Sequence, residues 1–95
     1  MLIHMVCFKY KQEIDAARRA EHRARLRALS TLPGILDLKV GEDVVHSSRS
    51  FDTGLVVTFP DRAALDAYQQ HPDHVPVAQL GVACTEKIIA VDFEA

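Results

Sequence analysis

The chain has 95 residues, of which 48% are hydrophobic and 25% charged, the composition of one ordinary folded domain. Its net charge of −2 argues against any general attraction to nucleic acid or to an anionic membrane. It has no apolar run of about 18 residues and no basic start, so we expect neither a membrane span nor a signal peptide.

The two cysteines, Cys7 and Cys84, lie in apolar, strand-like contexts. We therefore expect reduced, buried thiols in a soluble cytoplasmic protein, with residues 1–95 forming a single domain.

The first predicted element is a strand over residues 2–10, apolar on both of its faces. His4 is the one imidazole in it, and is either a satisfied core histidine or the lining of a pocket. A helix should follow from the capping residue Asp15 to about Leu32. Its five arginines are interspersed with acidic residues, which favours a solvated helix face over a phosphate-binding patch.

Two stripes of side chains run along this helix. We expect the stripe of His22, Leu26 and Leu29 to face the core. Part of a second, alanine stripe should lie beside it, and its members are Ala16, Ala20, Ala24 and Ala28. A half-exposed strand over residues 35–44 and a polar hairpin loop over residues 45–51 should follow.

The segment from Ser50 to Val77 contains the side chains most able to do chemistry. Residues 53–59 are β-branched and aromatic, which predicts a buried strand. Pro60 ends that strand, and the next residue can cap a helix that carries Tyr68 on its apolar face and stops near residue 70.

A proline separates this helix from a second short one. His71 precedes Pro72, which disfavours helical geometry at His71 and suits the start of a new helix. His74 then lies in the first turn, where the partial positive charge disfavours imidazolium. A neutral imidazole is what a general base needs, but both histidines can equally well serve as caps or surface residues. Two imidazoles without a third ligand nearby do not predict a metal site.

A last strand over residues 85–93 completes the order β-α-β-β-α-β. This order predicts an α+β, ferredoxin-like domain with a four-stranded antiparallel sheet and its helices on one face. Three strands are apolar on both sides, and each large apolar side chain gains roughly 1.5–3 kcal/mol from burial. We therefore expect a homodimer in which two sheets meet face to face as a dimeric α+β barrel. A small pocket should lie between sheet and helices.

These elements carry the landmarks of a known family. They are I-H-M-V-x-F-K at the start, then L-P-G-I, V-G-E-D-V, V-V-T-F, H-P-x-H, and I-I-A-V-D-F at the end. Together they resemble the stress-responsive dimeric α/β-barrel proteins, or Dabb domains, over nearly the whole chain. The resemblance implies the dimeric ferredoxin-like barrel, a soluble protein and, for most members, no assigned reaction.

A few plant members of this family resemble polyketide cyclases, which close a linear poly-β-ketone by an intramolecular aldol reaction without a cofactor. The tyrosine and the second histidine of H-P-x-H that act there match Tyr68 and His74, and the first-strand histidine matches His4. The first helix of this chain has alanine and arginine where large aromatic residues line the plant cavity, so the polyketide substrate does not carry over. Some members bind a divalent cation, for which this chain has no firm ligand set.

Three functions remain open. One is a stress-responsive or small-ligand-binding module with no reaction. The second is a cofactor-free lyase, cyclase or isomerase, with His74 as base, Tyr68 as donor to the oxyanion and His4 assisting. The third is a small monooxygenase acting on an electron-rich aromatic substrate. The expected partners are a second copy of the chain and a small carbonyl or aromatic ligand, with no cofactor, metal, nucleic acid or membrane.

Overall fold

The computed structural model describes every residue from 1 to 95. Its elements, in chain order, are β1 (Leu2–Tyr10), α1 (Ala16–Arg27), the 3₁₀ helix η1 (Ala28–Thr31), β2 (Asp37–Glu42), β3 (Thr53–Phe59), α2 (Arg62–Gln70), α3 (His74–Cys84) and β4 (Thr85–Glu94). The predicted order is confirmed, with the second helical region divided into α2 and α3. None of the helices combines the length and apolarity needed to cross a membrane.

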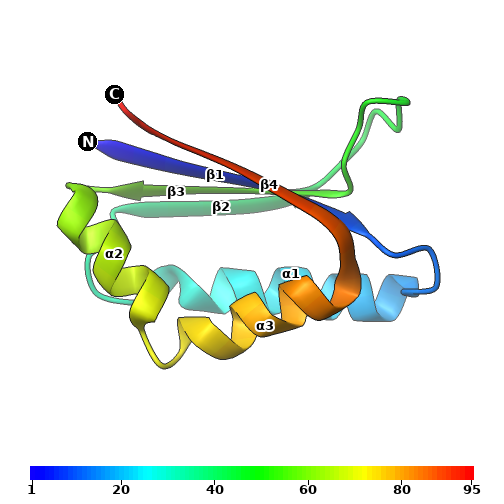
Figure 1. The fold of residues 1–95 in the computed structure, drawn as a ribbon, viewed down its shortest axis with the longest axis horizontal. Helices are drawn as coiled ribbons and strands as arrows, with labels where there is room; N and C mark the ends of the chain where they lie inside the picture. The colour runs from blue at the N-terminus through cyan, green and yellow to red at the C-terminus, as the bar shows by residue number, and fades with distance from the viewer.

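The four strands form one antiparallel sheet in the order β2-β3-β1-β4. All of the helices lie on the same face of this sheet, with α1 and α3 beneath it and α2 at one end (Figure 1). The ferredoxin-like α+β class is therefore confirmed. In the register between β1 and β4, His4 lies directly opposite Asp92.

The core lies between the helices and the inner face of the sheet. Val57 and Phe59 of β3 are completely enclosed there. His22 and Leu26 of α1 and Leu29 of η1 are buried as predicted. The alanine stripe of α1 is exposed instead, because the bulkier stripe occupies the contact with the sheet and leaves the alanines on the solvent side.

Helix α3 is longer than the sequence indicates and runs directly into β4. Gly81 does not end the helix and is buried within it. A Cβ at this position would lie 3.2 Å from Nε2 of His22 and 3.5 Å from Cε1 of Phe8. The glycine therefore allows α3 to pack closely against α1 and β1.

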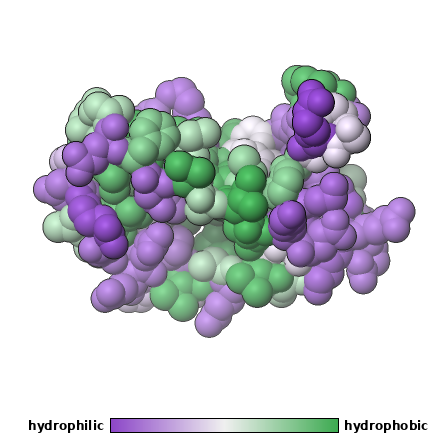
Figure 2. Space-filling view, turned by 45° about the horizontal axis from the view of Figure 1, so that its top comes forward, coloured by the Kyte–Doolittle hydropathy of each residue, from purple (hydrophilic) through white to green (hydrophobic).

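The outer face of the sheet has no helix over it. Its apolar side chains come from three strands and are Ile3, Met5, Cys7, Val56, Ile89, Val91 and Phe93. Val91 is 60% exposed and Phe93 is 42% exposed. Figure 2 shows apolar side chains gathered across the middle of the molecule, between hydrophilic ends. An apolar surface of this kind commonly marks an interaction site.

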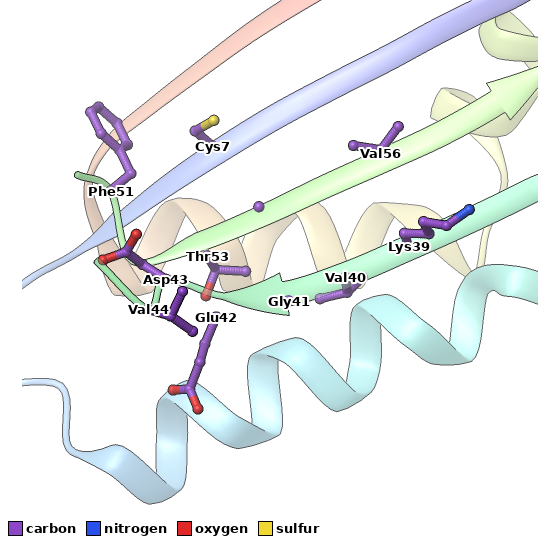
Figure 3. A pocket seen from close by; sticks show the side chains of 11 residues that line it. Cys7, Lys39, Val40, Gly41, Glu42, Asp43, Val44, Phe51, Thr53 and Val56 are labelled. Carbon is purple, nitrogen blue, oxygen red and sulfur yellow. The ribbon is translucent and has the colours of Figure 1, made fainter. Parts of the chain in front are cut away.

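The loop between β2 and β3 rises from one end of the outer face (Figure 1). A hollow of about 560 Å³ lies at its foot. Cys7, Val56 and Phe51 lie on the side of the sheet away from α1, around this hollow (Figure 3). It contains no histidine or tyrosine, so its size alone does not make it a site for acid–base chemistry.

Candidate functional site

A smaller cavity, of about 180 Å³, lies between the inner face of the sheet, α1 and α3. Most of its wall is apolar. The exceptions are four polar side chains that come from three different helical segments and one strand, namely His4, His22, Gln69 and His74. A few polar groups in a mostly apolar wall are the usual arrangement of a small-molecule site.

His74 is placed by the break between α2 and α3. Its Nδ1 lies 3.1 Å from the backbone carbonyl of Gln69, and a carbonyl can only accept a hydrogen bond. Nδ1 therefore carries the proton and Nε2 keeps a free lone pair. Burial lowers the pKa of His74 below its usual value, and the nearby His4 and His71 act in the same direction, although the bond to Gln69 opposes them. The ring is thus a neutral proton acceptor at pH 7.

His4 is held by the edge strand. Its Nδ1 is hydrogen-bonded to Oδ1 of Asp92, the residue opposite it on β4. The His4 side chain is buried and the Asp92 carboxylate is partly exposed, so the pair joins the cavity to the solvent side of β4. The carboxylate fixes the orientation of the imidazole.

Tyr68 packs against both of these rings. Its ring centroid is 4.4 Å from that of His74 and 6.3 Å from that of His4. Burial raises the pKa of Tyr68 to about 12, so the phenol stays protonated. Its hydroxyl is buried and has no hydrogen-bond partner in the protein. The structure thus brings the three predicted site residues together, but His4 and His74 line the cavity while Tyr68 lies behind them.

The other two histidines lie elsewhere. His71 is the C-cap of α2, and its Nδ1 accepts from the backbone N–H of Asp73 at 3.0 Å, just before α3 begins. His46 lies exposed in the loop between β2 and β3. Neither lines the cavity.

A second polar cluster lies at the other end of the cavity wall. The hydroxyl of Tyr10 is 2.7 Å from Nδ1 of His22 and 3.0 Å from Oγ1 of Thr53, and Arg23 donates to Thr53 at 3.2 Å. His22 is completely enclosed, and its Nε2 has no partner in the protein. Burial, with Arg23 and Arg25 adding to it, lowers the pKa of His22 to about 4.

The prediction of a solvated arginine face on α1 is confirmed for Arg18, Arg25 and Arg27, which are exposed, and is wrong for Arg19 and Arg23. Only 12% of the Arg23 side chain is exposed, and it bonds Thr53 and lies 3.4 Å from Glu42. The Arg19 guanidinium lies 5.2 Å from the centre of the Tyr10 ring. The basic residues on this side of α1 cover the polar cluster rather than facing free solvent.

Sequence reasoning missed three contributors to the site. Asp92 had a usable signal, because alternation along β4 places it on the same face as His4 in the neighbouring strand. The carbonyl of Gln69 had none, since any residue supplies that group. His22 was predicted to face the core, but no chemical role was assigned to it. No group of three or more histidine, cysteine or acidic side chains is arranged to hold a metal ion.

Comparison with known proteins agrees with this architecture. The stress responsive A/B barrel domain family matches residues 2–95. Olivetolic acid cyclase from Cannabis sativa is 25% identical over 93 residues, which cover 95% of this chain and 92% of that protein.

Two solved structures extend the comparison. A dimeric ferredoxin-like protein of unknown function from Jannaschia sp. CCS1 is 33% identical, with a TM-score of 0.84 and coverage of 99% of this chain and 98% of that one. A dimeric ferredoxin-like protein of unknown function from Thermobifida fusca has a TM-score of 0.91 at 20% identity, covering 99% and 90% of the two chains.

The low pKa of His22 predicts a specific loss of stability in acid. The folded protein holds His22 neutral down to about pH 4, whereas the unfolded chain protonates it near pH 6.5. The unfolded state therefore binds more protons as the pH falls, and the free energy of unfolding should drop by roughly 3 kcal/mol between pH 7 and pH 4 through this residue. Urea titrations across this pH range measure the free energy of unfolding.

The matched control is His22→Asn, whose amide oxygen can still accept from Tyr10 but cannot titrate. Its stability should fall less steeply with acidification than that of the wild type, since the carboxylates titrate alike in both proteins. Parallel curves for the two proteins would contradict the burial of a neutral His22.

Proposed function

Because the chain belongs to the stress responsive A/B barrel domain family, we propose that it is a homodimer that binds a small, mostly apolar molecule beneath its helices. The cavity of about 180 Å³ is the observation that carries this proposal. An apolar cavity of about 150 Å³ takes up a molecule the size of benzene. Sites for drug-sized ligands are larger, at roughly 300–1,000 Å³, so the ligand should be about one ring in size.

The polar groups in the wall select the chemistry of that ligand. The free lone pair on Nε2 of His74 favours a ligand with a proton to donate, such as a phenol or the enol of a carbonyl compound. The unpaired hydroxyl of Tyr68 lies behind this ring and can pair with a ligand oxygen after a small side-chain shift. Small aromatic or carbonyl compounds are therefore the proposed ligand class.

The cellular setting is proposed on other grounds. A role in the response to stress rests on the family description alone. A cytoplasmic location is supported by Cys7 and Cys84, which are both free thiols, as is usual in a reducing compartment.

Cofactor-free acid–base catalysis is a second candidate, favoured by the tautomer of His74. In this scheme Nε2 takes a proton from the carbon next to a carbonyl, and the C–H electron pair forms the enolate. The Tyr68 hydroxyl donates to the enolate oxygen, and the imidazolium returns the proton to the product. One relative is named as a cyclase, which fits this candidate.

A single titration with acetylacetone tests both functions. Binding should produce saturable NMR shifts at cavity methyl groups such as those of Val6 and Val77, because the compound is small enough for the cavity and carries an enol proton. Catalysis should in addition speed the exchange of its central C–H with deuterated water. His74→Ala should then lower the protein-dependent rate by about a hundredfold or more.

His46→Ala is the matched control, because His46 is exposed and far from the cavity wall. NMR shifts without faster C–H exchange would support the binding function and contradict the catalytic one. Shifts confined to the hollow around Phe51, or none at all, would contradict the proposed site.

The homodimer is supported by the uncovered outer face and by dimeric relatives of the same fold. We expect Val91→Lys, on that face, to weaken self-association by on the order of a hundredfold, because the interface would bury an unpaired ammonium group. Leu36→Lys changes a residue that is similarly exposed but lies off the face, and should leave association unchanged. Analytical ultracentrifugation measures both; a wild-type monomer, or equal effects of the two changes, would contradict the proposed interface.

A further inference from the structure

His22 presents an unused hydrogen-bonding nitrogen in the cavity wall. The residue is fully enclosed between α1, β1 and α3, and its ring centroid lies 4.8 Å from that of Phe8. Its Nδ1 is occupied by Tyr10, but its Nε2 has no partner in the protein. An unpaired buried donor or acceptor destabilises the folded protein. A ligand group that forms a hydrogen bond with it removes this destabilisation, which favours binding.

The hydrogen bonds around Tyr10 assign the proton on this ring. The guanidinium of Arg23 can only donate, so Thr53 accepts from it. Tyr10 is the remaining polar partner of the Thr53 hydroxyl, which therefore donates to the oxygen of Tyr10. The proton of Tyr10 then goes to Nδ1 of His22. With the hydrogen bonds in this direction, the hydroxyl protons of Thr53 and Tyr10 are both donated. Nδ1 of His22 is then an acceptor, so the proton of the neutral imidazole is on Nε2.

Gly81 packs closely beside that nitrogen. A Cβ at position 81 would lie only 3.2 Å from Nε2 of His22, tighter than an ordinary contact. The glycine therefore keeps a side chain of α3 away from the N–H group. The neighbouring α3 residues Val77, Ala78 and Val82 line the cavity together with His22.

We propose that His22 donates from Nε2 to an acceptor oxygen of the ligand, opposite the acceptor nitrogen of His74. The site would then take a one-ring molecule with a hydroxyl at one end and a carbonyl oxygen at the other. This assignment rests on the proposed ligand-binding function and gives the ligand an orientation. A hydroxyl can donate to Nε2 of His74, and of the two Nε2 atoms only the protonated one of His22 can donate to a carbonyl oxygen.

The spacing of the two histidines fits such a ligand. Gly81, beside His22, is seven positions from His74 on α3, which is roughly 10 Å along a helix. On β1, Phe8 lies beside His22 and His4 lies near His74. These two strand residues are four positions apart, which is roughly 13 Å along a strand. Subtracting two hydrogen bonds of about 3 Å each leaves roughly 4–7 Å between the ligand's polar atoms. The two oxygens of a para-disubstituted benzene ring lie in this range.

The test compares 4-hydroxybenzaldehyde with 4-methylphenol, a compound of similar shape that lacks the carbonyl. Calorimetric titrations are made at a pH at which both phenols are un-ionised. His22→Asn should weaken binding of the aldehyde about five- to tenfold and that of 4-methylphenol less than twofold, because only the aldehyde loses a hydrogen bond. His22→Gln, whose amide nitrogen reaches the position of Nε2, should recover most of the lost affinity.

Gly81→Ala provides a variant that leaves the Tyr10–His22 bond intact. Its Cβ crowds Nε2 of His22, so this variant should also weaken binding of the aldehyde more than binding of 4-methylphenol. Circular dichroism checks that both variants are folded. Equal effects of His22→Asn on the two compounds would overturn the assignment of His22 while the ligand-binding function stands. A wild-type protein that binds neither compound would overturn both.

Discussion

The hydrogen bonds at Nδ1 of His22 and His74 decide which of these rings presents an acceptor and which a donor in the cavity wall. The carbonyl of Gln69 accepts from His74 and leaves a lone pair on its Nε2. Tyr10 donates to His22 and leaves a proton on its Nε2. Burial lowers the pKa of both rings, so both stay neutral. Two residues of the same type therefore give the cavity one acceptor and one donor, and this difference depends on the groups behind the rings.

The one-sided coverage of the sheet makes both the cavity and the proposed interface possible. The helices bury the inner face of β1 and β3, whereas β4 is exposed at every residue after Thr85. On its inner side, Ile88 lines the cavity next to α3 and is 38% exposed. On its outer side, Val91 and Phe93 join the uncovered apolar face. The same edge strand thus borders the proposed ligand site on one face and the proposed partner on the other.

Much of this fold could be predicted from the sequence, because strong local signals lie at the element boundaries. Pro60 and the cap Asp61 mark the end of β3 and the start of α2. The length of α3 could not be predicted, because Gly81 lowers the local helix propensity, whereas the close packing of this glycine against His22 depends on the tertiary structure. The proton positions in the site could not be predicted either, since they depend on a backbone carbonyl and on groups far apart in the chain.

His22 and His74 are both neutral but carry their protons on opposite nitrogens. Two-bond ¹H–¹⁵N correlation spectra of the imidazole rings, recorded near neutral pH, measure this directly. We expect a proton on Nδ1 of His74 and on Nε2 of His22, and the spectra of His22→Asn and His74→Ala assign the signals to the two rings. The same tautomer at both rings, or an imidazolium at either, would contradict this expectation.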